Sequence, residues 1–154
     1  SVNEIYELAK KNDCKIFLPV DVVVSKDFIK NADHKIVNIN ECPSDHMILD
    51  IGEKSIELYK RIISSSKTIL WNGPLGAFET KPFDKGTNAL AKHTSLITVN
   101  KKCVSVAGGG DTVSALNSIN VTADFSYVSS AGGAFLEWLE GKELPGIKAI
   151  NLSK

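Results

Sequence analysis

The sequence has no excess of either charge and no long apolar run. Its 18 Lys and Arg residues balance 18 Asp and Glu residues, so the formal net charge is zero. A nucleic-acid-binding protein normally carries a basic surface, so this balance argues against a nucleic-acid partner. No apolar run approaches the roughly 20 residues that span a bilayer, and we expect no membrane association.

Cysteine is also scarce, with three residues, Cys14, Cys42 and Cys103, that form no Cys-x-x-Cys pair. An odd, scattered set argues against a disulfide framework or a zinc site and is typical of the reducing cytoplasm, where we expect the protein. The three histidines show no metal-ligand spacing either. The opening residues lack the layout of a signal peptide, and because a helical pattern starts at once, we expect a segment to precede Ser1.

Apolar runs alternate with helical patterns along a chain whose length suits one domain, residues 1–154. Helices are expected over about 2–11, after Gly52, over about 87–94, from Asp111 and over about 134–140. Strands are expected over 15–24 with a break at Pro19, and over 36–39, 48–51, 68–71, 103–107 and 125–128. This alternation predicts an α/β fold of three layers, a mostly parallel sheet with helices on both faces.

Ligands of such folds bind beyond the carboxyl ends of the strands, and the segment Val106 to Thr112 lies at one of these ends. Gly108, Gly109 and Gly110 allow a sharp turn and a close approach of the backbone to a ligand. The next helix offers unpaired N–H groups that suit a phosphate. Asp111 is either a first-turn carboxylate that favours the helix dipole or a carboxylate for Mg²⁺ beside a phosphate, and Thr112 offers a hydroxyl.

Two further junctions have unusual composition. Ser129 to Ala134 repeats the order of strand, small residues and helix, with Gly132 and Gly133 either a second phosphate cradle or a plain tight turn. Trp71 to Glu79 places Asn72 and Glu79 after another strand, where Glu79 is able to accept a hydrogen bond from a ribose hydroxyl. Asn-Gly-Pro is also ordinary turn chemistry, and Trp71 is expected in the core.

Taken in order, these segments resemble phosphoglycerate kinase. The resemblance covers nearly the whole chain, and its ordered set of motifs is far more specific than any one of them. The matching segments are 18–21, 49–52, 71–79, 106–112, 129–134 and 136–146. The chain is similar to the later part of the family's Rossmann-like, C-terminal nucleotide-binding domain.

The resemblance implies Mg²⁺-dependent phosphoryl transfer between 1,3-bisphosphoglycerate and ADP, giving 3-phosphoglycerate and ATP in glycolysis, by a monomer. By position, Asp111 resembles the Mg²⁺-linked aspartate and Thr112 a phosphate contact, and Gly108, Gly109 and Gly110 line the phosphate path. Asn72 and Glu79 resemble the groups that hold the nucleoside. Gly132 and Gly133 resemble the turn that faces the phosphoryl group in transit, where catalysis rests on positioning and charge neutralisation.

Two departures from the family pattern matter. Ser130 and Ala131 stand where the commonest pattern has Thr and Gly, and we expect little loss unless residue 131 needs a positive φ. The family's N-terminal substrate domain and the early part of its nucleotide-binding domain have no counterpart here. We therefore expect the chain alone to be inactive, and a non-catalytic nucleotide-binding or interaction chain is the alternative. A Rossmann-type oxidoreductase is disfavoured by the glycine spacing.

Overall fold

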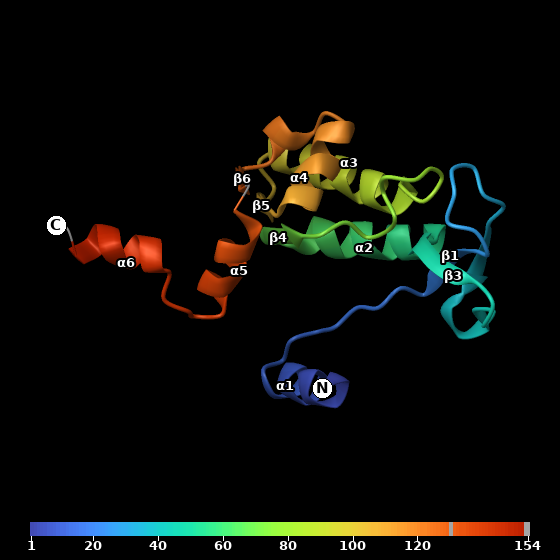
Figure 1. Ribbon diagram of the computed structural model, residues 1–154, viewed down its shortest axis with the longest axis horizontal. Coiled ribbons are helices and arrows are strands. Elements are labelled where there is room, and N and C mark those ends of the chain that lie inside the picture. The colour runs from blue at the N-terminus through green and yellow to red at the C-terminus, as the bar shows by residue number, and fades with distance from the viewer. Residues whose placement is uncertain (130, 153–154) are drawn as a thin grey trace.

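The computed structural model describes residues 1–129 and 131–152 (Figure 1). The α-helices are α1 (Val2–Lys11), α2 (Glu53–Ser65), α3 (Lys85–Val99), α4 (Gly110–Ser118), α5 (Gly132–Leu139) and α6 (Pro145–Leu152). The strands are β1 (Asp21–Ser25), β2 (Lys35–Asn38), β3 (Met47–Ile51), β4 (Thr68–Asn72), β5 (Val104–Gly108) and β6 (Tyr127–Ser129). Among the described residues, no helix is both long and apolar enough to cross a membrane.

The fold is α/β, as predicted, and its strands form two sheets. The first sheet has the antiparallel order β2-β1-β3, and the second has the parallel order β4-β5-β6. The connections explain this difference, since parallel neighbours need a crossover of a dozen or more residues. Helices α3 and α4 supply such crossovers in the second sheet, whereas only loops and a short 3-10 turn link β1, β2 and β3.

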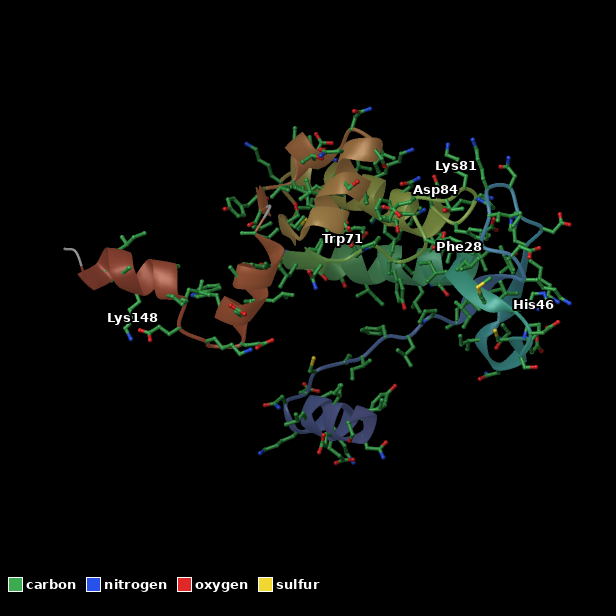
Figure 2. The ribbon with its side chains drawn as sticks, viewed as in Figure 1. Phe28, His46, Trp71, Lys81, Asp84 and Lys148 are labelled. Carbon is green, nitrogen blue, oxygen red and sulfur yellow. The ribbon has the colours of Figure 1, made fainter. Side chains whose placement is uncertain are left out.

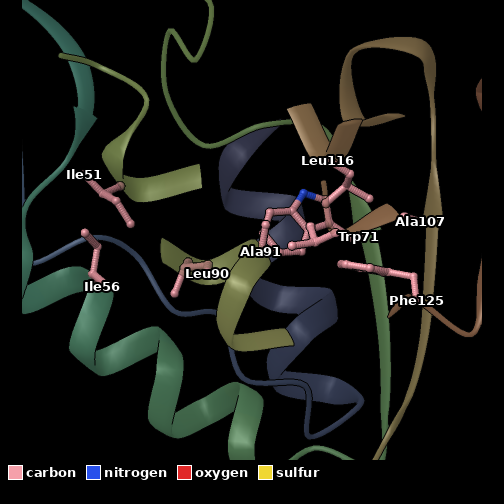
Figure 3. Close-up of a cluster of buried hydrophobic side chains, with 9 residues drawn as sticks. Ile51, Ile56, Trp71, Leu90, Ala91, Ala107, Leu116 and Phe125 are labelled. Atoms are coloured by element: carbon pink, nitrogen blue, oxygen red, sulfur yellow. The ribbon is translucent and has the colours of Figure 1, made fainter. Parts of the chain in front are cut away.

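The main core lies where α3 and α4 pack against the parallel sheet. Trp71 of β4 is 8% exposed and lies inside this packed body (Figure 2), and its ring meets Phe125 edge-on at a centroid distance of 6.2 Å (Figure 3). The other buried members of this cluster are Ile51, Ile56, Leu90, Ala91, Ala107, Leu116 and Val121. These contacts fix the carboxyl ends of the strands relative to the helices that follow them.

The opposite face of the parallel sheet is open within the described residues. Leu70, Val104 and Tyr127 project from this face and are 46%, 52% and 61% exposed. The helical cover predicted for both faces is therefore seen on one face of this sheet in the part of the chain described here. A buried parallel sheet normally has both faces covered.

The predicted strand over 15–24 is shorter than expected. It begins at Asp21, after Pro19, and residues 15–18 form no strand and are exposed. No described strand pairs with residues 15–18, so their apolar character has no ladder to join. The Phe17 carbonyl of this segment accepts a tertiary hydrogen bond from the Tyr59 hydroxyl at 3.2 Å.

Buried Asp21 supplies the cap that helix α2 lacks at its own N-terminus. Gly52 precedes the helix and has no side chain, so the first N–H groups need another acceptor. The carboxylate of Asp21 accepts from the Lys54 N–H at 3.0 Å, and from the N–H and hydroxyl of Ser55 at 2.7 and 2.6 Å. Burial acts to raise the pKa of Asp21, but the bonds from Ser55 and Lys54 outweigh it and lower the pKa.

Asp50 plays the corresponding part for helix α3. Its carboxylate is 2% exposed and accepts from the N–H of Gly86 and of Ile51, both at 2.8 Å. A Cβ atom on Gly76 or Gly86 would lie 2.5 or 2.4 Å from the Asp50 carboxylate, so both glycines are needed for this close packing. Asp50 therefore joins β3 to the start of α3 and to the loop that follows β4.

We predict that Asp50 makes stability depend on pH. Burial raises its pKa from 3.8 to about 6, although the hydrogen bonds from the N–H groups of Gly86 and Ile51 act to lower it. Between about pH 4 and 6 the folded chain then binds more protons than the unfolded chain, so the free energy of unfolding falls as pH rises. The full effect is on the order of 3 kcal/mol.

Urea unfolding of the wild-type chain and of Asp50→Asn at several pH values tests this. The difference between the two free energies of unfolding should change through the window from pH 4 to 6 and become constant above it. Titration of the other carboxylates contributes equally to both proteins and cancels in this difference. The pKa of Asp21 is lowered from 3.8, so its titration affects stability only below about that pH. Parallel curves for the two proteins would show that Asp50 does not titrate there.

Candidate functional site

The three junctions singled out in the sequence lie side by side at one edge of the parallel sheet. Asn72 ends β4, Gly108 ends β5 and Ser129 ends β6. Asn72 is the register partner of Gly108, and Gly108 is the register partner of Ser129. The three strands therefore end at the same level, so the three junctions begin at one edge of the sheet.

The first glycine turn leads from β5 into α4. Gly109 precedes the helix with φ +99°, a conformation that side chains rarely allow, and its N–H donates to the Ser129 carbonyl at 3.3 Å. A Cβ atom on Gly109 would lie 3.6 Å from Thr112 Oγ1 and 3.7 Å from Asn72 Oδ1. The space that a side chain at residue 109 would occupy is thus bordered by the Asn72 amide oxygen and the Thr112 hydroxyl.

The second turn packs directly on the first. A Cβ atom on Gly132 would lie 2.5 Å from Gly109 Cα and 2.9 Å from Gly109 N, which is closer than real Cβ atoms come. The N-termini of α4 and α5 therefore begin against one another. Ala131 has φ −91°, so glycine is not required there, as expected, while Ser130 lies outside the described residues.

Thr112 sits deeper than the sequence suggests. It is 1% exposed, and its Oγ1 accepts a hydrogen bond from the Gly73 N–H at 2.8 Å. This bond ties the start of α4 to the loop that carries Asn72. The hydroxyl hydrogen is not used in this bond and is available for a second partner.

Asp111 is exposed in the first turn of α4. In residues 1–129 and 131–152 no cluster of three or more His, Cys, Asp or Glu side chains is arranged to hold a metal ion. A lone carboxylate at this place still fits Mg²⁺, because that ion usually keeps several waters and takes its other ligands from substrate phosphates. The donor set therefore suits an ion that arrives with a nucleotide.

Glu79 lies apart from this group. It lines a depression of about 460 Å³ together with Phe28, Lys30 and Lys81. Figure 2 shows Phe28 and Lys81 beside the antiparallel sheet, well away from Trp71, the neighbour of Asn72. The structure thus brings together Asn72, the glycines and Thr112, and places Glu79 at the other end of the loop.

The sequence profile of the phosphoglycerate kinase family matches residues 1–142. The chain belongs to the phosphoglycerate kinase family. Phosphoglycerate kinase of Zymomonas mobilis subsp. mobilis is 53% identical over 150 residues, which are 97% of this chain and 38% of that protein. Phosphoglycerate kinase of Agrobacterium fabrum is 55% identical over 146 residues, 95% of this chain and 36% of its own length.

Solved structures of phosphoglycerate kinases share this fold. The structure from Coxiella burnetii has a TM-score of 0.87 and 41% identity, and it covers 95% of this chain and 37% of its own. The structure from Pyrococcus horikoshii has a TM-score of 0.80 and 27% identity over 99% of this chain and 36% of its own. The chain spans less than two fifths of these relatives.

The stretch from Cys103 to Gly141, which holds both glycine turns, contains no Lys or Arg. Any attraction that these turns exert on an anion must come from main-chain N–H groups and from the helix dipoles. In this member of the phosphoglycerate kinase family, these turns thus offer geometry for a phosphate rather than formal positive charge.

Sequence reasoning gave no role to the two buried aspartates. Asp21 begins β1 and Asp50 lies near the end of β3, and their carboxylates accept from helix N–H groups 33 and 36 residues further along the chain. No local pattern shows such distant partners. Thr87 carried no signal either, because its partner is the main-chain N–H of Leu75, 12 residues earlier.

We predict that the two glycines of α5 differ in their tolerance of alanine. Gly132→Ala should lower the free energy of unfolding by about 1–3 kcal/mol, because its Cβ meets the backbone of Gly109. Gly133→Ala is the matched control: a Cβ there meets nothing within 4 Å, and alanine favours a helix. Urea unfolding with far-UV circular dichroism measures both, and equal effects would contradict the packing of the two turns.

Proposed function

We propose that this chain forms the phosphate-binding side of a phosphoglycerate kinase. The reaction is the Mg²⁺-dependent transfer of a phosphoryl group between 1,3-bisphosphoglycerate and ADP, giving 3-phosphoglycerate and ATP in glycolysis. The observation that carries the proposal is the contact of Gly132 with Gly109, which sets two helix N-termini against one another. Two adjoining helix N-termini suit a polyphosphate better than one.

The proposed roles follow the geometry of the junctions. The main chain of Gly108, Gly109 and Gly110 lines the path of the nucleotide phosphates, and the N–H groups of Gly132 and Gly133 face the group in transfer. Thr112 donates its free hydroxyl hydrogen to a phosphate oxygen while it holds Gly73. Asn72 and Glu79 bind the nucleoside from the two ends of one loop. In-line transfer needs such positioning and no covalent intermediate.

Asp111 is the proposed residue for Mg²⁺. When bound, this ion neutralises charge on the nucleotide phosphates. The exposed carboxylate of Asp111, in the first turn of α4, lies beside the proposed phosphate path. The other proposed partners are small molecules, with no nucleic acid, no membrane and no second subunit, and the free cysteines suit the cytoplasm.

We predict that Asp111→Asn weakens binding of Mg-ADP about tenfold, because the amide removes the negative ligand for the ion. Isothermal titration calorimetry should show little change for ADP in excess chelator. Asp33→Asn, a change of the same charge at an exposed position away from the glycine turns, is the control. A loss shared equally by Asp33→Asn, or an equal loss without magnesium, would contradict the role of Asp111.

We also predict that the 154-residue chain alone does not turn over substrate. The glycine turns supply no Lys or Arg to neutralise the charge of the transferring group, and such neutralisation is a main source of rate in phosphoryl transfer. A coupled assay with 1,3-bisphosphoglycerate and Mg-ADP measures this, with a complete phosphoglycerate kinase as the positive control. ATP formation that rises with the concentration of this chain would refute the prediction.

A further inference from the structure

The loop over residues 72–79 is fixed through its main-chain N–H groups. Three of these groups, at alternate residues, each donate to a different element of the fold. The bonds run from Gly73 N to Thr112 Oγ1 at 2.8 Å, from Leu75 N to Thr87 Oγ1 at 3.0 Å, and from Ala77 N to the Leu49 carbonyl at 2.9 Å. Helix α4, helix α3 and strand β3 therefore hold the loop together.

Thr87 and Thr112 are the two side-chain anchors, and they are equally buried. Thr87 lies in the first turn of α3 and is 1% exposed, so water has little access to replace its hydroxyl. The neighbouring Gly86 N–H is bound by the buried Asp50 carboxylate, which locks this end of α3 to β3. The oxygen that accepts from Leu75 is thus held by rigid elements on two sides.

We propose that Thr87 is a positioning residue of the nucleotide site. By holding Leu75 it fixes the middle of the loop, and so fixes where Asn72 stands relative to Gly109. Within the described part of the chain the Thr87 hydroxyl bonds to the loop and not to the glycine turns, so it acts through the loop alone. This inference rests on the proposed function, because it assigns Thr87 to the binding of the same nucleotide.

The path from Thr87 to the site is short. Leu75 is three residues from Asn72, and Gly73 between them, at φ +88°, has no side chain to resist a change of its backbone angles, so its bond to Thr112 is what remains to hold it when Leu75 is released. Asn72 Oδ1 lies 3.7 Å from the place where a Gly109 side chain would stand. A small shift of Asn72 therefore alters the space beside Gly109.

Three variants separate this role from a general loss of stability. Thr87→Val keeps the shape but removes the acceptor, and Thr87→Ser restores a hydroxyl. Thr94→Val is the matched control: Thr94 lies in the same helix and is fully buried, and its hydroxyl has no partner within the described part of the chain. Each protein is titrated with Mg-ADP by calorimetry and unfolded in urea.

We expect Thr87→Val to bind Mg-ADP about tenfold more weakly than the wild-type chain, while Thr87→Ser and Thr94→Val stay within about twofold. An unchanged affinity in a folded Thr87→Val protein overturns the inference and leaves the proposed function intact. The same holds if Thr87→Ser fails to restore binding. If the wild-type chain itself binds no Mg-ADP, it is the proposed function that fails for this chain.

Hydrogen exchange measured by NMR decides the anchoring even without nucleotide, or if Thr87→Val does not fold. In the wild-type chain the Leu75 amide should exchange as slowly as the amides inside α3, and exchange as fast as a free loop overturns the inference. In Thr87→Val the Gly73 amide should exchange at least about tenfold faster than in Thr94→Val. Equal exchange rates of the Gly73 amide in these two variants would show that the bond from Leu75 to Thr87 does not restrict the loop near Asn72.

Discussion

The carboxylate of Asp50 is the constraint on which the arrangement of the site depends. It is buried, and it binds the Gly86 N–H at the start of α3 while Gly76 packs against it from the loop after β4. A strand, a helix and a loop thus meet at one carboxylate that has little access to water. Leaving a buried carboxylate without a hydrogen-bond partner costs more free energy than an ordinary hydrogen bond contributes. The three elements therefore keep one relative position.

Local chemistry decided which parts of this arrangement the sequence could predict. The glycine turns at Gly109 and Gly132 were predictable, because a positive φ or a close backbone contact needs glycine wherever the chain goes. The antiparallel sheet was not predicted, because an apolar run such as 48–51 does not show which strand it pairs with. Only the short connections between these strands indicate antiparallel pairing. The strand predicted over residues 15–18 was wrong for a related reason, because a β-strand forms only where another strand pairs with it.

The separation of Glu79 from the glycine turns has the same kind of cause. Residues 72–79 leave the sheet edge, and the bonds that fix Leu75 and Ala77 lead the loop along α3 to β3 rather than back to β5. Sequence order alone does not show how far apart the two ends of the loop lie. The first residue, Asn72, lies beside Gly109, and the last, Glu79, lines a depression with Phe28.

The contact between the two turns joins packing to chemistry. Because neither residue has a side chain, the backbones of Gly109 and Gly132 can touch. For the same reason no side chain at these two positions covers the N-termini of the helices that begin there. Ala131 shows how narrow the requirement is, since at φ −91° it keeps its N–H and its methyl group is tolerated one residue before the contact. Because the stretch from Cys103 to Gly141 has no basic side chain, the proposed binding of an anion depends on keeping these backbones in register.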